Sequence, residues 1–201
     1  MDKNVLNNIS YGLYVLTTRE DDKDNGCIIN TVQQVTTSPC VISVTVNKEN
    51  HTHDMLIRTG KFNVSCISID TEFDVFDKFG FVSGKDADKF ADWKDVDRSS
   101  NGICYLTKGV NGYLSGQVFH TVDMGTHTLF LAKVTDMESL SEDPSLTYAY
   151  YHRHIKPKPK ATENGGYRCI VCGYVYEGDE LPPDYVCPWC KHGPEDFEKI
   201  E

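Results

Sequence analysis

Four cysteines near the end of the chain form two Cys-x-x-Cys pairs, Cys169 with Cys172 and Cys187 with Cys190, separated by 14 residues. Two such pairs supply four thiolates from two short turns, as a tetrahedral sulfur cage around one metal ion requires. Two disulfide bonds are an alternative, but they would need an oxidising compartment, and nothing else in the sequence indicates secretion. A four-sulfur site suits both zinc and iron, and the spacing by itself favours a structural zinc ribbon.

Aromatic residues are concentrated around these cysteines. They are Tyr167, Tyr174, Tyr176, Tyr185, Trp189 and Phe197. A module of about 40 residues cannot build a sizeable hydrophobic core, so a bound metal and aromatic packing must stabilise it. We expect Gly173 to turn the chain back after the first pair, so that backbone N–H groups face the sulfur atoms and tune the potential of the metal.

This C-terminal segment resembles rubredoxin through its whole length. The matching residues are Tyr167-x-Cys169-x-x-Cys172-Gly173-Tyr174-x-Tyr176, Gly178-Asp179, Leu181-Pro182-Pro183-Asp184-Tyr185-x-Cys187-Pro188-x-Cys190 and Asp196-Phe197. Rubredoxins hold one redox-active iron in four cysteine sulfurs and pass single electrons, so the resemblance favours iron over zinc. The two pairs lie closer together than in the usual rubredoxin, which removes a long loop that carries no ligand.

The whole chain has 201 residues and a net charge of −10, enough for one full-sized domain and a small module. The negative charge argues against nucleic acid or an anionic membrane as a partner. No apolar run approaches 18 residues, and no charged-then-apolar leader is present, so we expect a soluble, cytoplasmic protein. Cys27, Cys40, Cys66 and Cys104 are single cysteines among apolar neighbours, and we expect buried reduced thiols.

The part of the chain before the cysteine pairs has a pattern that predicts many short strands with few helices. Such a pattern is typical of an antiparallel barrel. Strands are predicted at 11–18, 27–36, 40–47, 62–69, from 103 onward with a hairpin turn at Asn111-Gly112, and at 126–136. Helices are predicted at 2–8, at 52–59 with Gly60 as the closing residue, and at 72–79, with loops at 21–26 and 80–93.

Two segments place amide and hydroxyl groups at neighbouring strand ends. They are Asn30-Thr31-Val32-Gln33-Gln34-Val35-Thr36-Thr37-Ser38-Pro39 and Asn47-Lys48-Glu49-Asn50-His51-Thr52. The second segment also opens a helix, and a helix N-terminus attracts phosphate. Polar side chains at strand ends are usually satisfied within turns, so the cluster by itself does not establish a phosphate site.

The segment from Gly12 to about Tyr151 resembles the flavin reductase-like, FMN-binding split-barrel family. The family binds FMN noncovalently, usually as a homodimer with the flavin near the subunit interface. The resemblance implies that the isoalloxazine and ribityl chain are lined by Asn30, Thr31, Val32, Gln33, Gln34 and Thr36. It implies that the phosphate is held by Lys48, Asn50, His51 and Thr52. Residues that border the pocket in some members are Phe79, Ser83 and His127, although His127 could be an ordinary strand histidine.

A change of composition separates the two parts of the chain. Residues 152–166 form a basic, proline-containing run that predicts an extended, semi-rigid linker. The predicted organisation is therefore a barrel at 1–151, the linker at 152–166 and a rubredoxin-like iron-binding domain at 167–201. Residues 162–201 contain 3 Lys and Arg against 9 Asp and Glu, a net charge of −6, which leaves −4 for the rest of the chain.

Together the two parts resemble the high-molecular-weight rubredoxins. The resemblance implies a mainly β protein with FMN and one iron ion as cofactors. It also implies partners, with an NAD(P)H-linked rubredoxin reductase as donor and a flavodiiron oxygen or nitric oxide reductase as acceptor. FMN exchanges electron pairs or single electrons and iron only single ones, so the fusion could convert two-electron into one-electron transfer.

Two other functions remain open from the sequence. The chain could be an NAD(P)H:flavin or ferric reductase with the rubredoxin as an accessory electron outlet. It could also be a non-redox binding module with structural zinc. Because the cofactors would carry the chemistry, the sequence favours an electron carrier over a stand-alone enzyme and assigns no catalytic side chain.

Overall fold

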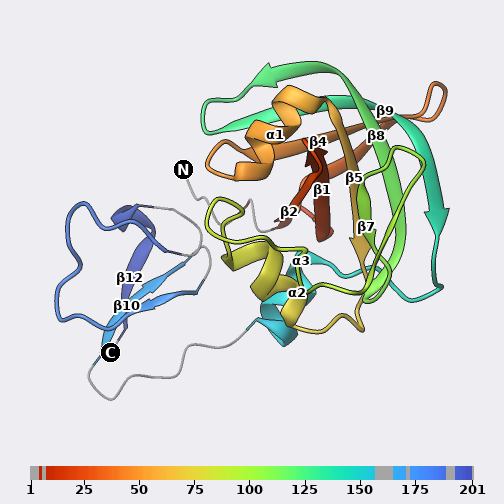
Figure 1. The fold of residues 1–201 in the computed structure, drawn as a ribbon. Coiled ribbons are helices and arrows are strands. Elements are labelled where there is room, and N and C mark those ends of the chain that lie inside the picture. Colours follow the sequence, from red (N-terminus) through yellow and green to blue (C-terminus); the bar gives the residue numbers. More distant parts are fainter. Residues whose placement is uncertain (1–4, 6–7, 157–164, 171–172, 189–192, 201) are drawn as a thin grey trace. The chain divides into compact units, whose positions relative to one another are not determined.

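The protein is described by a computed structural model, which covers residues 5, 8–156, 165–170, 173–188 and 193–200 (Figure 1). The chain divides into two compact units, Met1–Ile155 and Lys156–Glu201. Within the covered ranges, every helix is too short or too polar to span a lipid bilayer.

The first unit is built on one seven-stranded antiparallel sheet with the order β2-β1-β5-β8-β9-β4-β3. Its strands are β1 (Tyr14–Glu20), β2 (Lys23–Ile29), β3 (Val32–Thr36), β4 (Val41–Asn47), β5 (Lys61–Ile67), β8 (Val110–Asp123) and β9 (His127–Ser139). A small second sheet pairs β6 (Val96–Arg98) with β7 (Cys104–Leu106). The helical elements are α1 (His51–Thr59), α2 (Asp74–Phe76), the π-helical turn η2 (Asp77–Phe81), α3 (Tyr148–Tyr150) and the π-helical turn η3 (Tyr151–Ile155).

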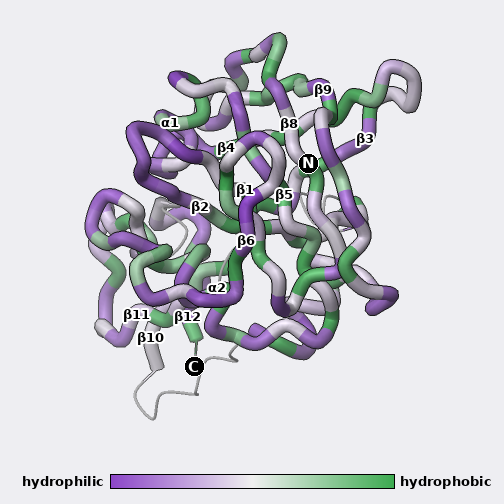
Figure 2. Tube along the Cα trace, turned by 45° about the vertical axis from the view of Figure 1, so that its right-hand side comes forward, coloured by the Kyte–Doolittle hydropathy of each residue, from purple (hydrophilic) through white to green (hydrophobic). Residues whose placement is uncertain are grey.

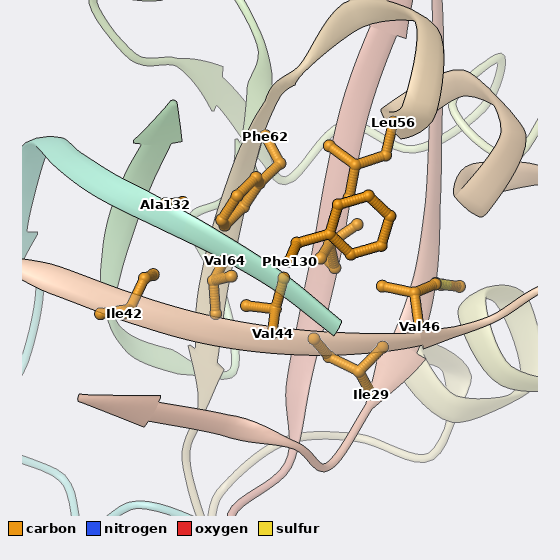
Figure 3. Close-up of a cluster of buried hydrophobic side chains, with 11 residues drawn as sticks. Ile29, Ile42, Val44, Val46, Leu56, Phe62, Val64, Phe130 and Ala132 are labelled. Atoms are coloured by element: carbon orange, nitrogen blue, oxygen red, sulfur yellow. The ribbon is translucent and has the colours of Figure 1, made fainter. Parts of the chain in front are cut away.

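The large sheet curls into a barrel around a shared core. Strand β2 forms one edge of the sheet and β4 lies next to the other edge, yet Ile29 and Val44 belong to one buried cluster (Figure 3). Phe130 of β9 and Leu56 of α1 enter the same cluster, both almost fully buried. Side chains from opposite ends of a sheet can meet only if the sheet bends around them, so the predicted antiparallel barrel is confirmed.

A second buried cluster lies on the other face of β1. Val15 and Leu16 are consecutive and fully buried, but Val15 packs in this cluster and Leu16 in the barrel core, as strand alternation requires. Phe76 and Tyr151, whose ring centroids are 4.5 Å apart, bring α2 and η3 against this face. Figure 2 maps the hydropathy of each residue along the chain, from purple for hydrophilic to green for hydrophobic.

The prediction of a single strand at 27–36 is wrong, because the chain changes partners in the middle of it. Ile29 pairs with Tyr14 of β1 at one edge of the sheet. Two residues later, the Thr31 carbonyl accepts a hydrogen bond from the Thr45 N–H (3.2 Å), beside β4. Residues 30 and 31 therefore form the crossing between the two edges, which ends β2 and begins β3.

The hairpin turn predicted at Asn111-Gly112 is also wrong, since both residues lie inside or at the start of the long strand β8. Gly112 pairs with Ser139, and a Cβ atom on Gly112 would lie only 2.8 Å from the Glu138 carbonyl oxygen. Glycine is needed there for close strand approach, not for a turn. The connection from β8 to β9 instead falls at residues 124–126, where Gly125 has a φ of 80°.

The helix predicted at 52–59 is confirmed with its cap. α1 ends at Thr59, and Gly60 follows with a left-handed φ of 65° while its N–H bonds to the Leu56 carbonyl. The helix predicted at 72–79 is replaced by the three residues of α2 and the π-helical turn η2. Most of the helix predicted at 2–8 lies outside the described residues.

The linker prediction can be followed only at its two ends. The first unit extends to Ile155, because η3 continues the chain after Tyr151 and Ile155 packs against the second cluster. The proline-containing part at 157–164 lies outside the described residues. The second unit has a three-stranded sheet of order β11-β10-β12, from β10 (Gly166–Cys169), β11 (Val175–Tyr176) and β12 (Phe197–Ile200), with the 3-10 turn η4 (Pro194–Asp196).

Candidate metal and flavin sites

The structure places two of the four predicted metal ligands in the interior of the second unit. Cys169 ends β10 and Cys187 follows a turn in which the Tyr185 N–H bonds to the Pro182 carbonyl. Both cysteines have 0% exposure. Cys172 and Cys190 lie outside the described residues, and within the part that is described no group of three His, Cys, Asp or Glu side chains is arranged to hold a metal.

The backbone folds tightly around Cys169. Gly173 has a φ of 79°, and its N–H donates to the Cys169 carbonyl at 2.7 Å, while the Cys169 N–H donates to the Tyr174 carbonyl at 2.8 Å. The predicted reversal at Gly173 is confirmed. The expectation that backbone N–H groups face the sulfur atoms stays a prediction, because Cys172 and Cys190 lie outside the described residues. Buried thiol groups presented by such turns fit a four-sulfur metal cage.

Aromatic side chains supply the packing that the short segment needs. The ring of Tyr185 lies 4.6 Å from that of Tyr176 and 5.4 Å from that of Phe197. Its hydroxyl donates to the Tyr174 hydroxyl at 3.3 Å. Burial and this neighbour raise the pKa of Tyr185. The prediction that aromatic residues take the place of a hydrophobic core is confirmed for these four side chains.

Three of the predicted flavin segments meet at one end of the sheet. Thr31 Oγ1 donates to the Thr45 carbonyl at 2.8 Å, which fixes the first segment beside β4. Asn47 at the end of β4 pairs with His127 of β9, and the Lys48 N–H donates to the Thr126 carbonyl at 3.0 Å. The pairing β3–β4–β9 therefore gathers residues 30–32, 47–51 and 126–128.

The phosphate segment offers groups that suit an anion. Asn50, the N-cap of α1, makes no side-chain capping bond, and the ring atom Nδ1 of His51 is buried without a hydrogen-bond partner among the described residues. An uncapped helix N-terminus leaves backbone N–H groups for a ligand. Lys48 adds an ammonium group, although Asp123 engages it at 2.7 Å. The residues present fit a flavin phosphate.

Other predicted flavin residues lie elsewhere on the first unit. Gln33, Gln34 and Thr36 are exposed along the edge strand β3, and Thr36 Oγ1 donates to the Pro39 carbonyl at 2.6 Å. Asn30 and Val32, by contrast, belong to the gathered end of the sheet and are partly buried there. Ser83 is exposed and accepts a hydrogen bond from the Lys85 N–H on its hydroxyl, within its own loop.

Two predicted site residues belong to the interior. Thr52 is 1% exposed, and its hydroxyl accepts a hydrogen bond from Asn25 Nδ2 at 3.0 Å. Phe79 is 1% exposed, with its ring against those of Phe90 and Trp93. Both side chains are enclosed by protein atoms, so they pack the fold and offer no open surface to a cofactor.

The structure also identifies residues near these segments that sequence reasoning missed. Lys89 is 3% exposed, and its Nζ donates to the carbonyls of Gly26 at 2.8 Å and Phe79 at 3.4 Å, which fastens the loop 80–93 to β2. Burial lowers the pKa of Lys89. His53 joins α1 to β9. Neither had a local signal, because a lysine in a charged loop and a helical histidine are usually exposed.

The scattered cysteines were predicted to be buried reduced thiols. Cys27, Cys40, Cys66 and Cys104 are free cysteines in the structure. Cys27 and Cys104 are buried, whereas Cys40 and Cys66 are only partly buried.

Comparison with known proteins gives two family matches. Residues 6–158 match the family described as "Flavin reductase like domain", and residues 167–198 match "Rubrerythrin, rubredoxin-like domain". The second match covers both Cys-x-x-Cys pairs, Cys169 with Cys172 and Cys187 with Cys190.

Individual proteins are similar to all or most of the chain. A protein of Moorella thermoacetica named "High molecular weight rubredoxin" is 35% identical over 100% of both chains. The "Ferric-chelate reductase (NAD(P)H)" of Archaeoglobus fulgidus is 36% identical over 81% of this chain and 95% of its own. Among solved structures, the NADH:FAD oxidoreductase SgcE6 of Streptomyces globisporus C-1027 has a TM-score of 0.65 at 20% identity, over 72% of this chain and 85% of that one.

Proposed function

This chain belongs to the flavin reductase-like family and continues into a rubredoxin-like domain, and from that premise we propose that it is a cytoplasmic electron carrier. Electrons would enter from an NAD(P)H-linked rubredoxin reductase, pass through FMN in the barrel and an iron ion in the four-cysteine site, and leave to a flavodiiron oxygen or nitric oxide reductase. The active form would be a homodimer.

One observation carries this proposal. The similarity to the high molecular weight rubredoxin covers both chains completely, so the combination of the two domains is shared and not only each domain separately. A flavin domain joined to a rubredoxin-like domain supports transfer between two redox centres. The donor, the acceptor and the dimer belong to the proposal alone.

The barrel's part is to hold the flavin. His51 and the free N–H groups at the start of α1 would bind the phosphate, and the polar crossing at Asn30 and Thr31 would lie along the isoalloxazine and ribityl chain. Bound FMN supplies exchange of an electron pair for single electrons. The protein's contribution is therefore position and electrostatics.

The second unit's part is to present the metal to a partner. Ile170 and Val186 lie next to the buried Cys169 and Cys187, and they are 59% and 55% exposed. The segment 162–201 carries a net charge of −6. A partner that reaches the metal would thus need apolar side chains surrounded by positive charge.

Anaerobic purification with flavin and metal analysis tests the cofactors. We expect one FMN and one iron per chain, and a visible spectrum with both flavin and iron–thiolate bands. NAD(P)H should reduce both centres only when a rubredoxin reductase is added. A protein with zinc and no flavin would contradict the proposal and support the structural-zinc alternative.

A salt series tests the partner. Electron delivery to a flavodiiron acceptor should slow as the ionic strength rises from about 0.01 to 0.15 M, because the Debye length falls from roughly 30 to 8 Å. The matched comparison is a variant with Asp179 and Glu180 changed to Asn and Gln, which should be slower at low salt and less salt-dependent. A rate independent of salt would contradict electrostatic docking of this unit.

A direct reductase is a second candidate, favoured by the similarity to the ferric-chelate reductase over 81% of this chain. In that case purified protein would oxidise NAD(P)H steadily with a ferric chelate and without a separate reductase. Measuring this oxidation with and without added rubredoxin reductase separates the two functions.

A further inference from the structure

His53 occupies a buried position between α1 and β9. The residue is 7% exposed. Both of its ring nitrogens have polar neighbours. Nε2 lies 2.9 Å from Thr128 Oγ1, and Nδ1 lies 3.1 Å from Asp54 Oδ1. The ring also meets Phe130 edge-on, with centroids 5.9 Å apart. A buried imidazole with three neighbours of this kind has a fixed orientation.

The partners determine where the ring protons lie. An ionised carboxylate can only accept hydrogen bonds, so Nδ1 carries a proton and donates to Asp54. In the neutral ring Nε2 is then an acceptor, and the Thr128 hydroxyl donates to it. The two residues are 75 positions apart in the sequence, so this bond joins two elements that no local interaction connects.

Both ends of this link lie in the candidate phosphate site. The His53 N–H donates to the carbonyl of Asn50, the N-cap of α1, at 2.9 Å. Thr128 follows His127, which pairs with Asn47 at the end of β4. His53 therefore ties the first turn of α1, where His51 lies, to the opening of β9, which Lys48 also contacts.

We propose that His53 is a positioning residue for the flavin phosphate, which holds the first turn of α1 at a fixed distance from β9 through Thr128. The proposal rests on the proposed flavin-binding function. His53 does not touch the phosphate itself, since its ring nitrogens are already engaged by Asp54 and Thr128. It sets the geometry of the uncapped N–H groups and of Lys48.

The test compares FMN with riboflavin, which lacks the phosphate, by flavin-fluorescence titration of the full-length protein. His53→Phe keeps the ring and its contact with Phe130 but removes both nitrogens. Thr128→Val removes only the hydroxyl at nearly constant volume. Each variant should weaken FMN binding roughly five- to tenfold while riboflavin binding changes less than about twofold. The matched control is Thr135→Val, a change on the same strand away from the site, which should alter neither affinity.

The double variant completes the experiment. Once His53 is Phe, adding Thr128→Val should cost little further FMN affinity, because the bond is already lost. Equal losses for FMN and riboflavin, or fully additive losses, would overturn the positioning role and leave a general effect on folding. A wild-type protein that binds neither flavin would instead overturn the proposed function.

Discussion

The ammonium nitrogen of Lys48 lies 2.7 Å from the carboxylate oxygen Oδ1 of Asp123, and this pair ties the turn after β4 to the end of β8. The bond to Lys48 is the main cause that holds the pKa of Asp123 below its usual range. The side chains are 35% and 72% exposed, so water screens the attraction. In the proposed flavin site, a bound phosphate would compete with Asp123 for Lys48.

Asp123→Asn should therefore strengthen FMN binding. The change frees the Lys48 ammonium and removes a negative charge close to the phosphate, and we expect a gain of roughly two- to fivefold. Riboflavin binding should stay constant, as should FMN binding in the control Asp136→Asn, which alters a carboxylate bonded to Ser100. Titrations at low and high salt measure the effect. A ratio of FMN affinity to riboflavin affinity that is the same in Asp123→Asn and the wild type would contradict it.

Cys187→Ser should abolish native iron loading and unfold the second unit. A small unit without a large core loses most of its folding energy with its metal. Flavin bound to the first unit should remain, because the two units are compact separately. Iron analysis and the visible spectrum give the readout, with Cys40→Ser in the barrel as the control. Normal iron content in Cys187→Ser would remove this cysteine from the ligand set.

Thr52→Val should destabilise the barrel, because it leaves the buried Asn25 amide without its acceptor. Asn25 is 4% exposed and Thr52 is 1% exposed, so water cannot replace the bond. We expect a loss of about 1–3 kcal/mol in the free energy of unfolding. Thr52→Ser keeps the hydroxyl and should lose less than half as much. Urea unfolding of both variants measures the difference, and equal losses would show that the hydrogen bond to Asn25 is not the cause.

Cys66 predicts a loss of stability in alkaline solution. Burial raises the pKa of Cys66 from 9.0 to about 11. Between these values the unfolded chain gives up the proton and the folded protein keeps it. Ionisation of Cys66 therefore leaves the free energy of unfolding unchanged below pH 9. As the pH rises from 9 toward 11, it lowers the free energy of unfolding by about 1.4 kcal/mol per pH unit.

Urea unfolding between pH 8 and pH 10 measures this slope. The upper limit matters because the pKa of the paired residue Tyr14 is also raised, by burial and by Cys66, and would add to the slope above pH 10. The Cys66→Ala variant should show a shallower decline than the wild type. Identical slopes in the two proteins would mean that Cys66 does not titrate differently in the folded state.

The local parts of the structure were predictable from the sequence. The two Cys-x-x-Cys pairs that begin at Cys169 and Cys187, with the aromatic residues around them, indicated a small metal unit, because both signals lie within a few turns of chain. Gly60 marked the end of α1 for the same reason, since a left-handed residue closes a helix through its own neighbours. The polar segments at Asn30 and Lys48 were found because each lies at the end of a strand.

The tertiary structure alone decided how distant segments meet. An Asn111-Gly112 pair is a turn signal locally, but the strand pairing of Gly112 with Ser139 overrides it. Thr52 and Phe79 matched a family motif, yet packing placed them inside the protein. The bonds Lys48–Asp123 and His53–Thr128 each join residues 75 positions apart. Such contacts depend on sheet register, which no window of sequence around either residue contains.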